Sequence, residues 1–120
     1  MVACRGIRGA ITVDEDTPEQ IIAATQELLK AVLEANQLPV EQLAALIFTS
    51  TPDLVSEYPA VAARQLGWTE VPLLCVQELP KQGSLPRCIR VLCLANTDRS
   101  PSEIKHVYLR GARSLRPDLG

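Results

Sequence analysis

The stretch CIRVLCLAN at residues 88–96 is a run of β-forming, almost wholly apolar residues that contains one arginine, Arg90. Such a run predicts a buried strand in which Ile89 and Val91 point to the face opposite Arg90. An unpaired guanidinium inside a fold destabilises it by several kcal/mol, so Arg90 needs an acidic partner or a bound anion. The strand pattern leaves two interpretations open: a structural ion pair, or a donor that points into a ligand pocket.

Glu78 is the candidate partner of Arg90. It follows the apolar residues of LLCVQEL at 73–79, and the next predicted strand carries Arg90. A hairpin between the two strands is therefore expected to bring both side chains to one site. Glu78 then pairs with Arg90 and does nothing more, or it accepts a hydrogen bond from a ligand hydroxyl, or it acts as a general base.

A long amphipathic helix is the clearest other element. Thr17 is its expected N-cap, Pro18 is its first residue, and Gln20 completes a capping box. Apolar residues gather on one face of the helix, which predicts that it covers a sheet; they are Ile21, Ile22, Leu28, Leu29, Val32 and Leu33.

The other elements complete an α+β pattern. Strands are expected at residues 2–13, 44–51, 71–79 and 88–95, with an extended segment at 105–110 and a short helix at 58–66. Pro59 suits the first turn of the short helix, and Gly67 suits its C-terminal exit. Ser100 and Glu103 form a second capping box, and Arg116, which precedes a proline, begins an extended tail. We expect a mixed sheet of about five strands packed against one long and one short helix, in a single domain over residues 1–120.

The composition argues against several functional classes. The formal net charge of −2 is atypical of nucleic-acid-binding proteins, and an aromatic content of 3% is too low for a base-stacking platform. No apolar run is long enough to span a membrane, and MVACRGIRGA at residues 1–10 lacks a signal-peptide pattern. We therefore expect a cytoplasmic protein whose partners include neither nucleic acid nor membrane.

The four cysteines lie in strand-like apolar segments, at Cys4, Cys75, Cys88 and Cys93. Their spacings contain no C-x-x-C, and the chain has a single histidine, His106, so no metal site is expected. The sequence predicts buried free thiols in a reducing compartment. A Cys–His nucleophile pair would require His106, and no family-type signature supports one.

Several other polar residues are candidates for a pocket around Arg90. Arg8 lies between two glycines in RGIRGA, and Tyr108 in HVYLRG is either a core residue or a pocket hydroxyl. By pattern alone, Arg64 and Arg116 are expected to be surface charges. Several arginines, one acid and one tyrosine, without a base–nucleophile pair, predict a site that binds a small polycarboxylate.

A series of motifs in fixed order resembles the monofunctional AroH class of chorismate mutase over essentially the whole chain. The motifs are RGIRGA at 5–10, TPDL at 51–54, YPA at 58–60, CVQE at 75–78, CIRV at 88–91, HVYL at 106–109 and LRPDL at 115–119. The resemblance implies a homotrimer whose sheets pack into a pseudo-α/β-barrel, with active sites in clefts between subunits. It also implies the Claisen rearrangement of chorismate to prephenate, a step of the shikimate pathway toward phenylalanine and tyrosine, with no cofactor and no metal.

The resemblance further implies a role for each matching residue. Arg90 donates to the ether oxygen of the breaking bond and reaches a carboxylate, while Glu78 accepts a hydrogen bond from the ring hydroxyl. Arg8 and Tyr108 each bind a carboxylate. The implied cleft and its entrance also include Tyr58, Arg64, Leu74, Cys75, Val76, Gln77, Leu115 and Arg116, the last in a tail that closes over the ligand.

One position departs from the family pattern, because Val61 stands where a lysine is common near the cleft entrance. This puts electrostatic steering by that position in doubt.

Two alternative functions remain open from the sequence. One is an enamine/imine deaminase-like trimer, against which the pairing of CVQE with CIRV argues, and the other is a non-catalytic trimer that binds small carboxylates. A pericyclic rearrangement fits the lack of a nucleophile, because it requires only the reactive conformer and fixed charges that match a polarised transition state.

Overall fold

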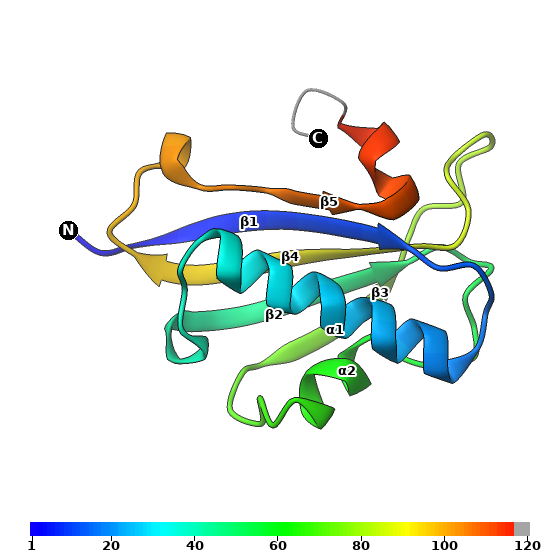
Figure 1. Cartoon of the computed structure of the whole chain (residues 1–120), viewed down its shortest axis with the longest axis horizontal. Coiled ribbons are helices and arrows are strands. Elements are labelled where there is room, and N and C mark those ends of the chain that lie inside the picture. The colour runs from blue at the N-terminus through cyan, green and yellow to red at the C-terminus, as the bar shows by residue number, and fades with distance from the viewer. Residues whose placement is uncertain (117–120) are drawn as a thin grey trace.

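The chain folds into a five-stranded sheet with two α-helices on one of its faces (Figure 1). The structure, a computed structural model, describes residues 1–116. The elements in chain order are β1 (Ala3–Thr12), α1 (Pro18–Ala35), the 3₁₀ helix η1 (Val40–Gln42), β2 (Leu43–Ser50), α2 (Ala60–Gln65), β3 (Leu73–Gln77), β4 (Cys88–Thr97), the 3₁₀ helix η2 (Pro101–Glu103), β5 (Val107–Leu109) and the 3₁₀ helix η3 (Arg110–Leu115).

The strand order is β3-β2-β4-β1-β5. β4 runs antiparallel to both β1 and β2, whereas β5 is parallel to β1 and β3 is parallel to β2. The predicted α+β fold with a mixed sheet is therefore confirmed. The predicted hairpin between β3 and β4 is wrong, because β2 lies between these two strands.

The long helix α1 begins where the sequence predicts. The Thr17 side chain accepts a hydrogen bond from the Gln20 backbone N–H at 3.2 Å, and Pro18 occupies the first turn. The reciprocal half of the predicted capping box is wrong, because Gln20 Oε1 accepts from the backbone N–H groups of Asp14 and Glu15 instead. The Thr17 N–H already donates to the carbonyl of Glu15. No helix within residues 1–116 has the length and apolar character needed to cross a membrane.

The core lies between α1 and the sheet. α1 contributes Ile21, Leu28 and Val32, each fully buried, while Ile22 and Leu33 of the predicted face are only partly buried. The helix comes close to β1 because position 9 is glycine. A Cβ atom there would lie 3.1–3.2 Å from side-chain atoms of Leu28, Val91 and Val32, tighter than ordinary contact. The absence of a side chain at Gly9 therefore sets how closely α1 covers the sheet.

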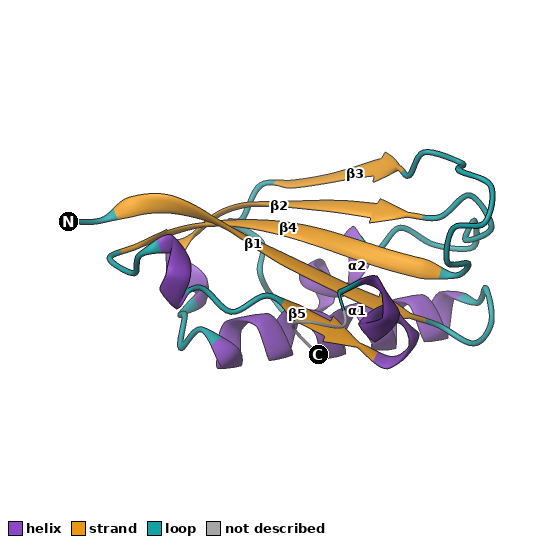
Figure 2. Ribbon diagram, turned by 90° about the horizontal axis from the view of Figure 1, so that it is seen from above, coloured by secondary structure: helices purple, strands orange, loops and turns teal. Residues whose placement is uncertain are grey.

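The opposite face of the sheet is left open by both α-helices (Figure 2). Leu74, Val76 and Leu92 remain 56%, 42% and 38% exposed on it. One end of this face is covered by a small second cluster of Ala10, Cys88 and Ala112, with Tyr108 and Leu115 packed against it. The open face therefore combines exposed apolar residues with a partly covered end.

The C-terminal segment contains a helix that the sequence analysis did not assign. η3 forms at Arg110–Leu115, and Arg110, which was expected to be extended, turns the chain with a φ of +54°. Ala112 of η3 is fully buried against Ala10 and Cys88, so contact with the sheet rather than local propensity explains this turn. The predicted tail beyond Arg116 lies outside the described residues.

The prediction of four buried thiols holds for Cys88 and Cys93 only. Cys4 is exposed and Cys75 is partly buried, because each lies on a strand position that the helices do not fully cover. All four are free thiols. Burial raises the pKa of Cys88 to about 11 and that of Cys93 to about 12, so both stay protonated at neutral pH.

Candidate active site

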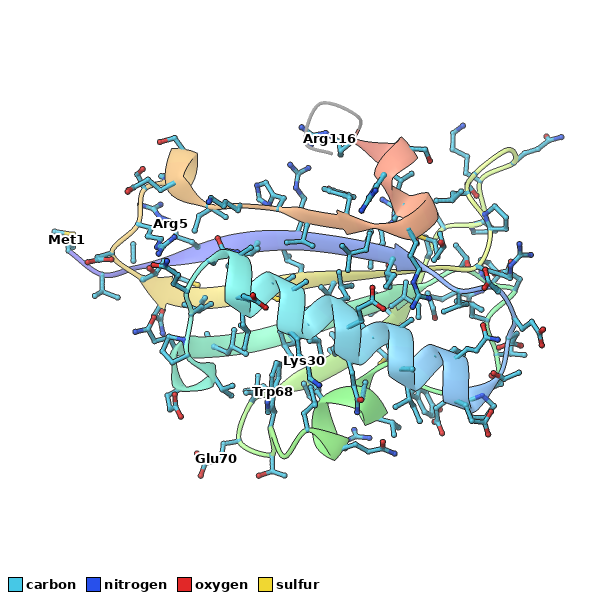
Figure 3. The ribbon with its side chains drawn as sticks, viewed as in Figure 1. Met1, Arg5, Lys30, Trp68, Glu70 and Arg116 are labelled. Carbon is cyan, nitrogen blue, oxygen red and sulfur yellow. The ribbon has the colours of Figure 1, made fainter. Side chains whose placement is uncertain are left out.

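A cavity of about 480 Å³ opens on the uncovered face of the sheet. Four strands and η3 surround it, and Glu78 reaches it from just beyond β3. Six residues predicted for the site line this cavity: Arg8, Glu78, Arg90, Tyr108, Leu115 and Arg116. Figure 3 shows Arg116 at the end of η3, on the β5 edge of the molecule.

Strand register explains how distant residues meet in this cavity. In one row across the sheet, Arg90 pairs with Thr49 on β2 and with Ala10 on β1, which in turn pairs with Tyr108 on β5. In the next row, Leu92 pairs with Ile47 and Arg8. Residues in register on neighbouring strands share a face of the sheet. The two rows therefore bring Arg90, Tyr108 and Arg8 to the open face together.

Glu78 reaches Arg90 across an intervening strand. Arg90 Nε lies 2.8 Å from Glu78 Oε1, and the Thr49 hydroxyl donates to Glu78 Oε2 at 3.3 Å. The Glu78 backbone N–H donates to the carbonyl of Ser50 at 3.1 Å, which fixes the chain just after β3. The predicted meeting of the two charges occurs, although not through the predicted hairpin. Thr49 was missed by the sequence analysis because nothing local marks it as the bridge between two strands.

The ion pair leaves part of the guanidinium unsatisfied. Arg90 Nε is buried and has no hydrogen-bond partner within the described part of the chain, because Glu78 Oε1 is near it but not in line with its N–H. The Arg90 and Glu78 side chains are 43% and 20% exposed. A guanidinium has five N–H donors, and the contact with Glu78 is made at Nε. Arg90 therefore keeps donor capacity that an anionic ligand in the cavity can use.

A thiol next to Arg90 does not provide a nucleophile. Burial is the main cause of the raised pKa of Cys88, and it outweighs the opposing effect of the Arg90 charge. His106 Nδ1 is already engaged as the acceptor for the backbone N–H of Arg8 at 2.9 Å. The described residues also contain no cluster of His, Cys, Asp and Glu side chains suited to a metal ion. The chemistry of the cavity is therefore that of fixed charges and hydrogen bonds.

The remaining predicted residues lie elsewhere on the chain. Tyr58, Cys75, Val76 and Gln77 line a second cavity of about 450 Å³, formed by residues 50–59 and the end of β3. Tyr58 is 68% exposed and Leu74 is 56% exposed. Arg64 is exposed on α2 and lines neither cavity. One chain therefore carries two separate groups of the predicted site residues.

Asp16 fixes the loop that presents Tyr58, and sequence analysis missed it. Its Oδ1 accepts hydrogen bonds from the Ser56 hydroxyl at 2.8 Å and from the backbone N–H groups of Val55 and Ser56, each at 3.1 Å. The Ser56 hydroxyl is the largest cause of the lowered pKa of Asp16, followed by burial, which opposes it, and the two backbone contacts. This carboxylate thus ties the segment before α1 to the segment before α2.

Comparison with known proteins gives a consistent result. Residues 4–119 match the family model described as chorismate mutase type I. The chain is 62% identical over 116 residues to chorismate mutase AroH of Thermus thermophilus, and this alignment covers 96% of this chain and 95% of that protein. It is 45% identical over 116 residues to chorismate mutase AroH of Bacillus subtilis (strain 168), covering 96% of this chain and 91% of that protein. The solved chorismate mutase from Clostridium thermocellum superposes with a TM-score of 0.91 at 47% identity, covering 92% of this chain and 98% of that one.

Proposed function

Since the chain belongs to the type I chorismate mutase family and is itself a chorismate mutase, an isomerase that converts chorismate to prephenate, we propose how it does so. In this proposal the open-face cavity holds chorismate in its compact reactive conformer, and Arg90 stabilises the transition state. The position of Arg90, paired with Glu78 and lining one cavity with Arg8 and Tyr108, is the observation that carries the proposal.

Four polar residues of the cavity have proposed counterparts on the substrate. Chorismate carries two carboxylates, for which we propose Arg8 and Tyr108, with Arg90 reaching one of them. Arg90 also donates to the ether oxygen, which gains negative charge as its bond to carbon breaks. Glu78, held by Thr49, accepts a hydrogen bond from the ring hydroxyl. The register that puts Arg90, Tyr108 and Arg8 on one face supports this assignment.

Two physical effects supply the rate enhancement. Holding the two reacting ends of one molecule together removes an entropic barrier before the reaction begins. A fixed positive charge at the ether oxygen interacts more strongly with the transition state than with the ground state, so it lowers the barrier. Neither effect requires a nucleophile or a proton transfer.

We propose that the active enzyme is a homotrimer with its sites in clefts between subunits, its sheets packed into a pseudo-α/β-barrel. The separation of the predicted residues into two groups on one chain supports this arrangement. In the trimer, the group that includes Tyr58 and Cys75 of one subunit faces the Arg90 cavity of its neighbour. The exposed Leu74, Val76 and Leu92 on the open face supply apolar area for such contacts. The proposal also includes Arg64 and Gln77 at the cleft, a single domain over residues 1–120 and a cytoplasmic location.

The test follows the reaction directly. Purified protein is incubated with chorismate, the decay of chorismate absorbance is recorded, and prephenate is identified as the product. We expect a rate far above the spontaneous rearrangement, and light scattering at micromolar concentration should give the mass of three chains. No acceleration would contradict the mechanism, and a monomeric mass with full activity would contradict the shared cleft. The family match favours this function over a deaminase-like enzyme or a non-catalytic carboxylate-binding protein.

A further inference from the structure

His106 lies beside the candidate site, but none of the roles proposed above involves it. It immediately precedes β5, and its Nδ1 accepts a hydrogen bond from the backbone N–H of Arg8 at 2.9 Å. Arg8 lines the cavity on the open face. The only histidine of the chain is thus bonded to the main chain of a residue proposed to hold a substrate carboxylate.

This contact lies at the point where the β1–β5 ladder begins. β5 pairs with β1 from Gly9 opposite Val107 to Ile11 opposite Leu109, so regular pairing starts one residue after Arg8. An edge strand of this length has few backbone hydrogen bonds to hold it in register. The imidazole adds one bond at the start of the ladder. The same register places Tyr108 opposite Ala10 and so on the face that carries Arg8.

The surroundings keep the imidazole in the form that accepts this bond. Burial, and then the charges of Arg8 and Arg116, lower the pKa of His106 below its ordinary value of 6.5. The ring is therefore neutral at neutral pH. A neutral imidazole has one acceptor nitrogen, whereas a protonated one has none. The bond from the Arg8 amide assigns the acceptor to Nδ1 and the proton to Nε2.

We propose that His106 is a positioning residue for substrate binding, which through Nδ1 fixes the backbone of Arg8 and the start of β5 so that Arg8 and Tyr108 face the cavity together. The inference rests on the proposed function, in which both side chains bind substrate carboxylates. Those carboxylates are present in the ground state and in the transition state alike. Loss of positioning should therefore raise KM more than it lowers kcat.

Two substitutions with side chains of nearly equal size separate the loss of the hydrogen-bond acceptor at position 106 from the loss of packing there. His106→Asn keeps an oxygen acceptor close to the place of Nδ1, whereas His106→Leu has none. We expect the Leu variant to raise KM for chorismate about three- to tenfold, the effect of one lost hydrogen bond, with kcat within about twofold. The Asn variant should remain near the wild-type KM.

Amide hydrogen exchange at Arg8 gives a readout that does not depend on activity. The Arg8 amide should exchange faster in the Leu variant than in the wild-type protein, and it should stay protected in the Asn variant. Equal KM increases in the Leu and Asn variants would overturn the proposal, because they would indicate lost packing rather than a lost acceptor. An Arg8 amide that exchanges equally in all three proteins would overturn it as well.

Arg8→Met separates this inference from the proposed function. If Arg8→Met raises KM and His106→Leu does not, Arg8 binds substrate without help from His106 and the positioning role is wrong. If Arg8→Met leaves KM unchanged, the proposed role of Arg8 is wrong and the positioning role falls with it. In the double variant, His106→Leu should add little to the effect of Arg8→Met, because the two act through one contact.

Discussion

The two faces of the sheet differ although the same strands build both of them. On the helix-covered face of β4, Ile89 and Val91 are 0% and 3% exposed. On the open face, the Arg90 side chain is 43% exposed and Leu92 is 38% exposed. Neighbouring residues of one strand therefore have separate tasks: one set holds the fold, and the other set forms the site. Substitutions at adjacent positions should separate stability from turnover.

The largest expected effect comes from removing the charge on the open face. Arg90→Met should lower kcat about 10²–10³-fold, the usual result of losing one preorganised donor at a developing charge. Its thermal midpoint should change little, because a partly exposed ion pair contributes little to stability. Chorismate turnover at saturating substrate, with a thermal melt of the same sample, checks both parts. Normal turnover in this variant would reduce Arg90 to a structural ion pair.

The adjacent residue on the covered face should show the opposite behaviour. Ile89 is fully buried, so Ile89→Ala should lower the free energy of unfolding by about 2–5 kcal/mol through lost burial and a residual cavity. Denaturant unfolding measures this at one fixed protein concentration, because the stability of an oligomer depends on concentration. The folded variant should keep kcat within a few-fold of wild type. Unchanged stability with a large loss of kcat would remove the distinction between the faces.

Replacing Thr49 tests the open face through a smaller expected loss of activity than the one expected for Arg90→Met. Thr49→Val removes the hydroxyl that donates to Glu78 and should lower kcat/KM about three- to tenfold. Thr49→Ser keeps the hydroxyl and serves as the matched control. If the Val and Ser variants have the same kcat/KM, the bond from Thr49 to Glu78 has no part in catalysis.

The smallest expected effect is a pH dependence that originates at His106, which lies beside the candidate site at the start of β5. The pKa of His106 is lowered in the folded chain, so the unfolded chain takes up a proton first as the pH falls below about 6.5. The free energy of unfolding should therefore be greatest above this pH and decrease as the pH falls towards 5. The covered face offers Cys93, whose pKa of about 12 keeps it from titrating in this range. As the pH is lowered from 8 to 5, the denaturant midpoint should fall more steeply for the wild-type protein than for His106→Asn, and equal slopes would contradict this origin.

Local patterns predicted the secondary structure because caps and alternation are properties of neighbouring residues. Thr17 and Pro18 start α1 as expected, and the alternation around Arg90 separates the two faces of β4. Strand order is a property of distant residues, and here the prediction was wrong. A hairpin was expected between β3 and β4, whereas β2 lies between them and supplies Thr49. Ala112 likewise gave no local sign that η3 would pack on the sheet.

The sequence predicted those candidate-site residues whose charge differs from the apolar character of their neighbours. Arg90 is a charge in an apolar strand, and Glu78 ends an apolar segment, so both were marked by sequence alone. Asp16 and His106 act through backbone groups of distant segments, and a sequence contains no signal for such contacts. The place of Arg64 in a cleft stays a prediction, because one chain leaves it exposed on α2.

The claim that the open face holds the substrate can be tested by adding prephenate to isotope-labelled protein and recording nuclear magnetic resonance spectra. We predict that the largest shifts fall on the Arg90 Nε–H and on the backbone amides of Arg8, Thr49 and Tyr108, which meet at one cavity. Residues of α1, on the other side of the sheet, should shift little. Shifts confined to α1 and the covered face, with the Arg90 Nε–H unmoved at saturating prephenate, would contradict the proposed site.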